Sequence, residues 1–387
     1  MATLRTVVVG AGIMGVTAAR ALRARGHAVT LCDTGPIPHA LAASTDISKI
    51  VRIEYGADAA YTALGERSLD GWRRWNAELG EDLFHETGVL FVSRAPMAPG
   101  GFEHDSHETI LARGHAPERL DGEALAARFP AWKTGRYVDG FFHAKGGFVE
   151  SGRVVERLVS KARDEGVVVR EGASFDTLVD ASPGVVLRGR EVLTADRVVM
   201  AVGAWTPHVF PELMGTLRAT GHPVFHLRPR DPERFVAARF PVFGAAIAET
   251  GWYGFPLHPR SGVVKVARHS VGRSVHPTAA ARDVIDEERG ALRDFLTETF
   301  PELLDAEVVA TRVCLYCDSA DGHFWIDRDP ARPWLTVAAG DSGHGFKFAP
   351  VLGDLIADAV EGQPADPRFR WRAGQRPQRH EEAARHR

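Results

Sequence analysis

The chain lacks the features that mark several large classes of protein. Its 387 residues include only three cysteines, which are too few for a disulfide scaffold. No apolar run reaches the roughly 18 residues that a membrane-spanning helix needs. The formal net charge is −3, so no excess of positive charge favours nucleic acid as a partner. These absences predict a soluble globular protein with neither a membrane nor a nucleic-acid partner.

The first residues carry no pattern of a secretory signal. The chain enters an apolar strand at Thr6 without a charged region or a small-residue cleavage site before it, so a cytoplasmic location is expected. The length exceeds the roughly 250–300 residues at which single hydrophobic cores stop growing. The sequence therefore predicts two domains.

A glycine-rich motif follows the first strand. The apolar residues 6–9 run directly into Gly10-Ala11-Gly12-Ile13-Met14-Gly15, and an alanine-rich helical pattern comes next. In this order Gly10 permits the tight turn, Gly12 lets the backbone approach a pyrophosphate, and Gly15 lets helix and strand pack closely. The N–H groups and partial positive charge of the helix N-terminus would then hold the phosphates. The motif predicts a dinucleotide-binding unit.

A second strand ends at an acidic residue. The apolar pattern over residues 27–32 is followed by Asp33, which lies 18 residues after Gly15. An acid at about this distance is expected to hydrogen-bond a ribose hydroxyl of the cofactor. A strand-to-helix turn with no ligand would not require this acid, so the complete pattern favours cofactor binding.

Later segments have the same character. In residues 196–205, and again in residues 334–345, apolar residues run into small residues and glycine, which is typical of a buried parallel strand that ends at a ligand. A further cofactor-domain segment begins at residues 147–150, and residues 221–319 alternate short strands with turns, as a separate antiparallel domain would. Because several segments return to one nucleotide, the pattern suits a flavoprotein better than a nicotinamide dehydrogenase with consecutive halves.

Local patterns predict the elements between these segments. Leu64, Leu69, Trp72 and Trp75 recur at roughly helical spacing, and residues 84–92 have a strand-like pattern that a polar, Pro/Gly-rich stretch over residues 94–115 interrupts. That stretch contains His104, His107 and Glu108, whose spacing would suit a metal pair on a helix. No third ligand lies nearby in the sequence, so no metal is expected.

Several short motifs then occur in a characteristic order. They are Tyr253-Gly254-Phe255-Pro256, Lys265 with His269, Cys314-Leu315-Tyr316, His323-Phe324-Trp325-Ile326-Asp327 and Gly343-His344-Gly345-Phe346-Lys347-Phe348. Over nearly the whole chain, their order and spacing resemble the FAD-dependent amine oxidases of the monomeric sarcosine oxidase and N-methyltryptophan oxidase family. The resemblance implies a monomeric enzyme that oxidises the C–N bond of a secondary amine, with O2 becoming H2O2.

The fold predicted from these observations is α/β. It combines a discontinuous Rossmann-type FAD-binding domain with a second, substrate domain built on a mostly antiparallel sheet, and the active site lies between them. The expected segments are residues 1–85, 145–220 and 320–368 for the FAD-binding domain, residues 86–144 and 221–319 for the substrate domain, and residues 369–387 for a solvated, arginine-rich C-terminal tail.

The resemblance implies that FAD is bound covalently through Cys314, which is expected on a strand just before a loop. A thiolate there would attack the 8-methyl carbon of the flavin, and its reactivity would depend on a lowered pKa. The spacing Cys314-x-x-Cys317 also permits a redox dithiol or an attachment at Cys317, whereas zinc needs more ligands than Cys32 would add. The remaining expected cofactor contacts are Ile13, Met14, Ser44, Val168, Gly203, Trp205, Gly343, Gly345, Phe346 and Lys347.

Two further positions are expected to be catalytic. The family places a lysine at Lys265 near flavin N5, where its ammonium group would stabilise the superoxide formed during reoxidation. His269, four residues on, falls on the same strand face and is expected to position the substrate or to tune the local charge. The alternatives are a solvent-facing lysine on an edge strand and a structural histidine.

Arg52 and Lys347 are the expected clamp for a substrate carboxylate. Arginine offers a planar fork that holds a carboxylate through two hydrogen bonds, and lysine adds a point charge. The alternative is a pair of surface cations. The family places Tyr253, as a catalytic residue, and Tyr316 in the wall of the same site, where ordinary packing is the alternative.

One position departs from the sarcosine oxidases. They carry an arginine where this chain has Lys49, over the flavin face opposite the substrate. Residues 46–50 look more like the branch of fructosyl amino acid, saccharopine and pipecolate oxidases, and residues 369–372 point the same way. Lys49 is therefore kept among the expected catalytic residues, while sarcosine itself becomes doubtful as the substrate.

The expected function is oxidation of a secondary-amine amino acid, N-alkylated or cyclic, to an imine. The alternatives are a fructosyl amino acid oxidase, an FAD-dependent desaturase or dehydrogenase of a biosynthetic intermediate, a non-catalytic flavin-binding subunit and a nicotinamide reductase. Lys265 argues against a dehydrogenase that avoids O2, and Cys314 with the clamp argues against a non-catalytic subunit. No acidic general base is evident, so the substrate amine has to be neutral when it reacts.

Overall fold

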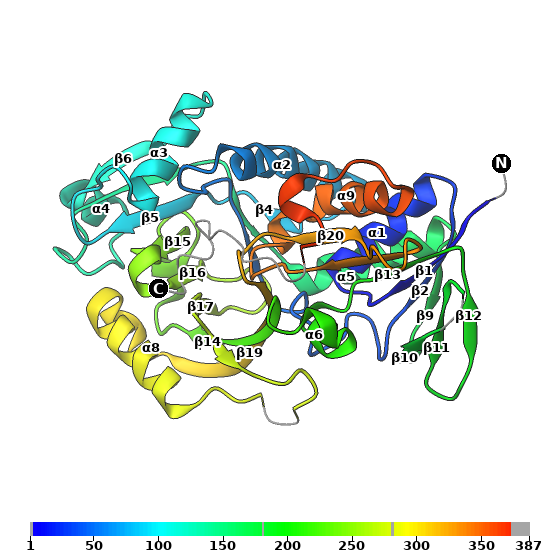
Figure 1. Cartoon of the computed structure of the whole chain (residues 1–387). Coiled ribbons are helices and arrows are strands. Elements are labelled where there is room, and N and C mark those ends of the chain that lie inside the picture. The colour runs from blue at the N-terminus through cyan, green and yellow to red at the C-terminus, as the bar shows by residue number, and fades with distance from the viewer. Residues whose placement is uncertain (1–2, 180–181, 280–281, 373–387) are drawn as a thin grey trace.

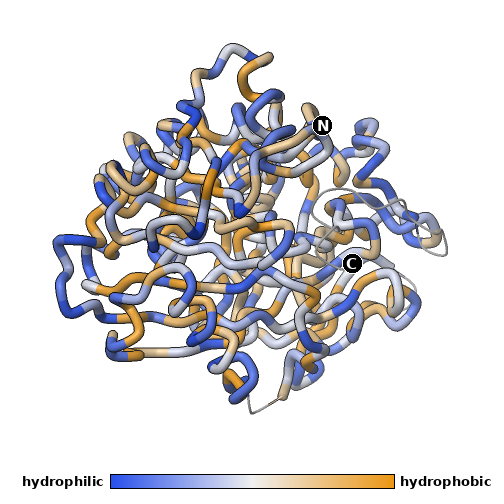
Figure 2. Tube along the Cα trace, turned by 90° about the vertical axis from the view of Figure 1, so that its left-hand side faces the viewer, coloured by the Kyte–Doolittle hydropathy of each residue, from blue (hydrophilic) through white to orange (hydrophobic). Residues whose placement is uncertain are grey.

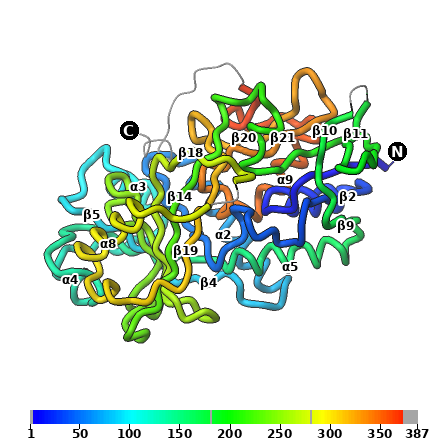
Figure 3. Tube along the Cα trace, turned by 90° about the horizontal axis from the view of Figure 1, so that it is seen from below, coloured from blue at the N-terminus to red at the C-terminus, as the bar shows by residue number. Residues whose placement is uncertain are grey.

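Two large sheets organise the chain in the computed structural model, which describes residues 3–179, 182–279 and 282–372. Figures 1 and 3 show one sheet with its helices at one end of the molecule and helices α3, α4 and α8 at the other end. Figure 2 shows hydrophobic stretches running through the interior and hydrophilic stretches along the outer turns. Among the described residues, no helix is both long enough and apolar enough to cross a membrane.

The first sheet has six strands and the predicted Rossmann-type topology. From edge to edge they are β20 (Trp325–Arg328), β21 (Leu335–Ala339), β13 (Arg197–Met200), β1 (Arg5–Val9), β2 (Ala28–Cys32) and β9 (Val168–Arg170). All neighbours are parallel except β20 and β21. The central strands read as continuous apolar runs because both of their faces are buried.

Different elements cover the two faces of this sheet. Helices α1 (Ile13–Ala24), α5 (Ser151–Asp164) and α9 (Ala349–Glu361) pack on the side where Val8 and Val199 point. The antiparallel strands β10 (Phe175–Leu178), β11 (Gly184–Leu187) and β12 (Val192–Thr194) cover the side of Val7 and Val198. The two faces alternate along each strand, as the pleat requires.

The second sheet has nine strands and is mostly antiparallel, as predicted. Its strands are β18 (Arg273–Ser274), β14 (Leu217–Arg228), β17 (Val264–Arg268), β16 (Trp252–Phe255), β15 (Val242–Ala245), β5 (Val89–Ser93), β7 (Asp139–His143) and β6 (Glu118–Asp121), with β19 (Glu307–Ser319) paired along β14. Only β15 and β5 pair in parallel among the described strands of this sheet. Helix α8 (Asp286–Thr299) covers it through Leu292, Phe295 and Leu296.

A small sheet joins early and central parts of the chain. Its middle strand β8 (Gly147–Val149) pairs with β3 (Lys49–Val51) and β4 (Phe84–His85). The other α-helices are α2 (Ala59–Leu79), α3 (Phe102–Ala112), α4 (Gly122–Arg128), α6 (Thr206–Val209) and α7 (Ile247–Thr250). The 3₁₀ turns are η1 (Gly203–Trp205), η2 (Pro211–Leu213), η3 (Pro232–Phe235), η4 (Pro301–Leu303), η5 (Phe346–Phe348) and η6 (Pro367–Phe369).

The six strands of the first sheet come from the three segments expected for the cofactor domain. The strands of the second sheet come from residues 86–144 and 221–319, except that β14 begins at Leu217. The exact domain boundaries stay a prediction. In the expected tail, Phe369 is buried and Trp371 lies edge-on to Trp325 at 5.3 Å, while residues 373–387 lie outside the described residues.

The local structure agrees with some expectations and differs from others. Residues 84–92 contain strands as expected, but β4 and β5 belong to different sheets, because Gly88 between them has a φ of 74° and turns the chain. The polar stretch over residues 94–115 contains helix α3, whose first turn carries acidic residues that suit a helix N-terminus. Residues 221–319 include long strands and α8, and Cys314 lies within the 13-residue strand β19 instead of just before a loop.

Candidate active site

A cleft opens at the carboxyl ends of the parallel strands, where Rossmann-type sheets bind their ligands. Several segments that are far apart in the sequence line it, and they bring together most of the residues expected to contact the cofactor. Among its lining residues are Gly10, Gly12, Ile13, Met14, Asp33, Ser44, Gly203, Trp205, Gly343, Gly345 and Phe346. The sequence signals were therefore correct about which distant segments meet.

The glycines of the first motif differ in what surrounds them. A Cβ on Gly10, whose φ is 95°, would lie 2.4 Å from the carbonyl oxygen of Ala201, and a Cβ on Gly15 would lie 1.7 Å from the carbonyl oxygen of Gly10. A Cβ on Gly12 would meet only Ser44 Oγ, at 3.3 Å. Gly10 and Gly15 thus permit close packing, while Gly12 leaves room at the start of α1 for a phosphate group.

Two side chains hold this loop in place. The Asp33 carboxylate accepts a hydrogen bond from the Ala11 N–H at 2.7 Å, and Ser44 Oγ accepts one from the Ile13 N–H at 3.0 Å. Both also line the cleft. Together with the open face of Gly12, they fit the ribose and pyrophosphate parts of a dinucleotide such as FAD.

Three predicted cofactor contacts of the first domain do not line the cleft: Gly15 packs against the Gly10 carbonyl, Lys347 lies in a neighbouring cavity described below, and Val168 lies elsewhere. It sits in edge strand β9 with 58% of its surface exposed. The nearby part of the cleft is lined instead by Ala173, Ser174 and Phe175. These residues follow the strand, so the ends of β9 and β2, rather than their middles, reach the cleft.

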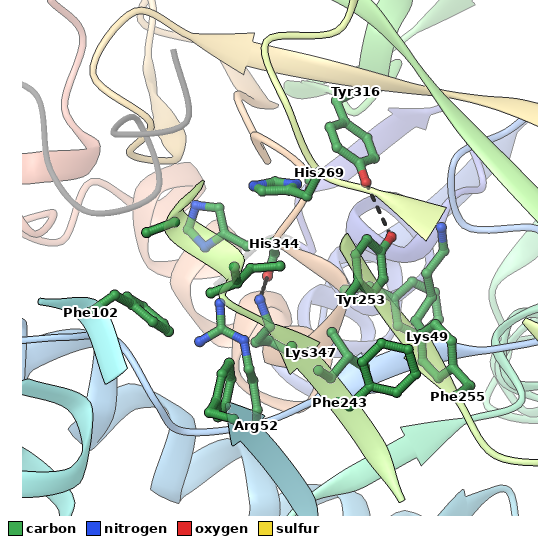
Figure 4. A pocket seen from close by; sticks show the side chains of 17 residues that line it. Lys49, Arg52, Phe102, Phe243, Tyr253, Phe255, His269, Tyr316, His344 and Lys347 are labelled. Carbon is green, nitrogen blue, oxygen red and sulfur yellow. Dashed lines mark hydrogen bonds between the residues drawn. The ribbon is translucent and has the colours of Figure 1, made fainter. Parts of the chain in front are cut away.

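A smaller cavity, here called the inner cavity, adjoins the cleft. Lys49, Tyr316, Gly343 and Phe346 line both spaces. The inner cavity also has Arg52, Tyr253, His269 and Lys347 in its wall, together with apolar residues that include Phe91, Phe102, Phe243, Ile247 and Phe255. Figure 4 shows these side chains converging from several strands and loops. All the predicted substrate-binding residues therefore lie in one cavity.

Arg52 and Lys347 are linked through Tyr55, which the sequence analysis did not identify. The Arg52 guanidinium lies over the Tyr55 ring at 4.7 Å, and Lys347 Nζ donates a hydrogen bond to Tyr55 Oη at 3.0 Å. Tyr55 Oη is also 3.0 Å from His344 Nδ1. Tyr55 is fully buried and Lys347 nearly so, so packing fixes Lys347, while the half-buried Arg52 stacks on the Tyr55 ring. No local pattern around Tyr55 signals this role.

Lys49 and Cys314 form a contact at the junction of the two spaces. Lys49 Nζ donates to Cys314 Sγ at 3.4 Å. Burial disfavours the ammonium form, but the Cys314 sulfur and the Asp46 carboxylate outweigh it and raise the pKa of Lys49. Cys314 lies just behind the wall, packed against Ala43 and Tyr316.

Cys317 faces the other way. Alternation along β19 places it on the opposite face of the strand from Cys314, in the cluster that contains Cys32 and Trp325. All three cysteines are free, and burial raises the pKa of Cys317. In this arrangement Cys314 and Cys317 do not form a redox pair.

Lys265 lies one layer behind the cavity wall. Its ammonium group is 2.6 Å from the Asp46 carboxylate, donates to the carbonyl oxygen of Ser48 at 2.5 Å and lies 4.7 Å from the centre of the Phe255 ring. Burial lowers the pKa of Lys265 to about 8, although Asp46 opposes the shift. For Asp46, burial raises the pKa, but the positive charge of Lys265 outweighs it and holds the value well below the ordinary one. Asp46 was missed as a site residue, because only the fold brings it to Lys265.

His269 follows the last residue of β17 and lines the inner cavity. Its N–H donates to the carbonyl oxygen of Gly251 at 2.7 Å, and its ring centre lies 5.7 Å from that of Tyr316. The hydroxyl groups of Tyr253 and Tyr316 are 3.5 Å apart. These three rings form one side of the cavity, across from Arg52 (Figure 4).

The two histidines of the suggested metal pair have local partners. His104 lies 3.0 Å from Asp105, and His107 lies 2.8 Å from Glu108. Within the described part of the chain, no group of three or more His, Cys, Asp or Glu residues is arranged to hold a metal ion.

Comparison with known proteins places this geometry in context. Residues 5–359 match the family described as FAD dependent oxidoreductase. A monomeric sarcosine oxidase of Streptomyces avermitilis is 30% identical over 94% of this chain and 96% of that protein. A monomeric sarcosine oxidase of Bacillus sp. (strain B-0618) is 27% identical over 91% and 90%, and the L-saccharopine oxidase of Schizosaccharomyces pombe is 26% identical over 95% and 92%.

A solved structure shares the fold. The fructosamine oxidase Amadoriase II of Aspergillus fumigatus gives a TM-score of 0.85 at 22% identity, covering 99% of this chain and 93% of that one. At this identity the likeness concerns the fold alone. The resemblance inferred from the sequence motifs is confirmed by these matches.

Proposed function

Because the chain belongs to the family of FAD-dependent oxidoreductases, we propose that it oxidises the C–N bond of a secondary-amine amino acid, N-alkylated or cyclic, to an imine. The relatives named for sarcosine, N-methyl-L-tryptophan and L-saccharopine act on secondary amines that carry a carboxylate. When bound, FAD accepts the electrons of the substrate and passes them to O2, which becomes H2O2.

The observation that carries the proposal is the pair of cations in the inner cavity. Arg52 and Lys347 line this small space next to the cleft, and Tyr55 contacts both. A guanidinium group binds a carboxylate through two parallel hydrogen bonds, and an ammonium group adds attraction. A carboxylate bound there would fix the substrate so that its amine faces the residues shared with the cleft.

The charges of the cavity also favour the reactive form of the amine. None of the described residues that line it is an aspartate or a glutamate, while Lys49, Arg52 and Lys347 are cations. Positive charges disfavour an additional positive charge nearby and so lower the pKa of a bound amine. The substrate amine would therefore lose its proton on binding, without a carboxylate acting as the base.

The remaining residues have supporting roles in the proposal. Cys314, whose sulfur lies 3.4 Å from Lys49 Nζ, would carry the covalent bond to FAD. Lys265 would supply positive charge for the reaction with O2, and Tyr253, Tyr316 and His269 would shape the wall around the substrate. A monomer in the cytoplasm stays the expectation, supported for the oligomeric state by the relatives named as monomeric.

The fructosyl amino acid alternative rests on residues 46–50 and stays open. A substrate screen separates the candidates: H2O2 release is measured with N-methyl amino acids, pipecolate, proline and fructosyl amino acids, each next to its decarboxylated amine. We expect activity only with carboxylates. Decarboxylated amines that react as well as their parent acids would contradict the role of the cations.

Substitutions at Arg52 test the same proposal at the protein level. Arg52→Ala removes charge-assisted hydrogen bonds worth about 1.5–3 kcal/mol, so KM for the best substrate should rise roughly 10- to 150-fold with a smaller change in kcat. Arg52→Lys is the matched control for charge, and it should restore only part of the affinity because a point charge does not replace a planar fork. Full rescue by lysine would argue against a bidentate contact.

A further inference from the structure

We propose that the substrate carries a large apolar side chain, which lies in a second cavity outside the inner one. This inference rests on the proposed function, because it takes the amino acid carboxylate to be held by Arg52 and Lys347. It names the substrate class more closely: secondary-amine amino acids with a bulky hydrophobic side chain, in preference to N-methylglycine.

The second cavity, here called the outer cavity, directly adjoins the inner one. Ile247, Ala248 and His269 line both, so these residues belong to the boundary between the two spaces. The outer cavity has a volume of about 440 Å³, against about 100 Å³ for the inner cavity. The inner cavity therefore suits the carboxylate and amine, and the larger space beyond it remains for another substituent.

The rim of the outer cavity exposes apolar side chains. Val271, in the loop after β17, is 46% exposed, and Ile285, directly before α8, is 42% exposed. Pro223 and Ala291 add further apolar surface to the same lining. Exposed apolar residues that gather around one concave space mark a binding surface more often than isolated ones do.

Most charged side chains of this lining already bind other groups of the protein. Arg273 and Glu288 form an ion pair at 3.2 Å. Arg268 donates to the carbonyl oxygen of Thr250 and lies over the Trp252 ring, while the exposed Glu249 adds one carboxylate. Since the cationic groups are mostly engaged within the protein, apolar contact rather than charge would select the group that binds.

The positions of Arg52 and His269 in the inner cavity indicate where the substrate side chain points. Arg52 lies across the cavity from His269 (Figure 4). If the substrate carboxylate binds Arg52 and the amine faces the cleft, the side chain on the substrate Cα is directed toward His269 and Ile247. Those two residues belong to the boundary with the outer cavity.

A series of N-methyl amino acids tests the inference with the unmodified protein. Initial rates of H2O2 release give kcat/KM for N-methylglycine, N-methylalanine, N-methylleucine and N-methylphenylalanine. Each buried methylene contributes roughly a fourfold gain, so kcat/KM should rise at least about tenfold from the first to the last. A flat or falling series would overturn the inference while leaving the proposed function intact.

Variants locate the effect in the outer cavity. Val271→Asp and Ile285→Asp should each lower the ratio of kcat/KM for N-methylphenylalanine to that for N-methylglycine at least about fivefold. Val192→Asp and Val308→Asp change similarly exposed valines outside this lining and should leave the ratio unaltered. An unchanged ratio in the rim variants would place the side chain elsewhere and overturn the inference. Absence of oxidation with every N-methyl amino acid would overturn the inference, and absence with pipecolate and proline as well would overturn the proposed function.

Discussion

Cys314 and Cys317 lie on opposite faces of β19, three residues apart in the sequence. Of the two, Cys314 has Lys49 Nζ 3.4 Å from its sulfur, while Cys317 is buried in an apolar cluster and burial raises its pKa. The difference follows from the two-residue period of a strand, and it makes the two cysteines a matched pair for experiment.

The first prediction uses this pair. After acid denaturation, the yellow colour should stay with the polypeptide of the unmodified protein and of Cys317→Ala, but it should separate from Cys314→Ala. The reason is that only the Cys314 sulfur has a cation beside it at the edge of the cleft. Free flavin from the unmodified protein would show that the bond does not exist.

The second prediction concerns Lys265 and Asp46. Lys265→Met should spare anaerobic reduction by substrate and slow reoxidation by O2 about 10²- to 10³-fold, as removal of a well-placed charge does at comparable sites. Because the pKa of Lys265 is about 8, its charge is present below that pH. The reoxidation rate of the unmodified enzyme should therefore fall as the pH rises through about 8.

Asp46→Asn is the companion variant. The Asp46 carboxylate raises the pKa of Lys265 against the effect of burial, so its removal should move the fall in reoxidation rate to lower pH. Stopped-flow measurement of the two half-reactions checks both variants. Equal loss in reduction and reoxidation would assign Lys265 and Asp46 to structure instead of oxygen chemistry.

At the scale of elements, the start of α1 combines two glycines with different tasks. We expect Gly15→Ala to lower the thermal unfolding midpoint, since its Cβ would lie 1.7 Å from the carbonyl oxygen of Gly10 and overpacking typically costs about 1–3 kcal/mol. Gly12→Ala should leave folding almost unchanged and reduce the flavin content, because its Cβ enters the cleft. Loss of stability in Gly12→Ala equal to that in Gly15→Ala would contradict this division.

Some helices and strands could be predicted from the sequence pattern, and others could not. Strands β1, β13 and β21 were predictable because burial on both faces demands continuous apolar runs that end in small residues. The length of β19 was not predictable, since residues 307–312 are largely exposed and this part of the strand is held by its pairing with β14. Helix α3 was missed because its polar composition conceals the few residues that it buries, such as Ile110.

The residues of the candidate site also differ in whether the sequence identifies them. The presence of Lys49 and Lys347 at the cavity was predictable, because both lie in segments with a family resemblance. Asp46 and Tyr55 were not identified, because each acquires its partner from a part of the chain more than 200 residues away. Contacts of this kind arise from the tertiary fold and leave no trace in the local sequence.

At the scale of the whole molecule, buried carboxylates connect distant segments. Asp46 pairs with Lys265, and Glu54 lies 2.7 Å from His143. Burial alone would raise the pKa of Glu54, but His143 outweighs it and lowers the value, as Lys265 does for Asp46. A lowered pKa means that the unfolded chain binds more protons than the folded one near pH 4.

The corresponding prediction is a loss of stability in acid. These carboxylates stabilise the fold fully at pH values above their unfolded pKa of about 4, and the contribution is lost as the pH falls toward their folded values. The midpoint of urea unfolding should therefore drop steeply between pH 5 and pH 3, in part through Asp46 and Glu54. Glu54→Gln should flatten this drop; a midpoint that does not change down to pH 3 would exclude the linkage.

The last part of the chain, which contains α9, returns to the first sheet. This order of segments has a consequence for how the protein is made. Helix α9 packs beside α1 in one core, and Gly343, Gly345 and Phe346 complete a cleft that begins at Gly10. Residues up to Phe346 have therefore to be synthesised before the last wall of the cleft exists. Because all strands of the second sheet precede this residue in the chain, FAD binding has to wait until that sheet has been translated.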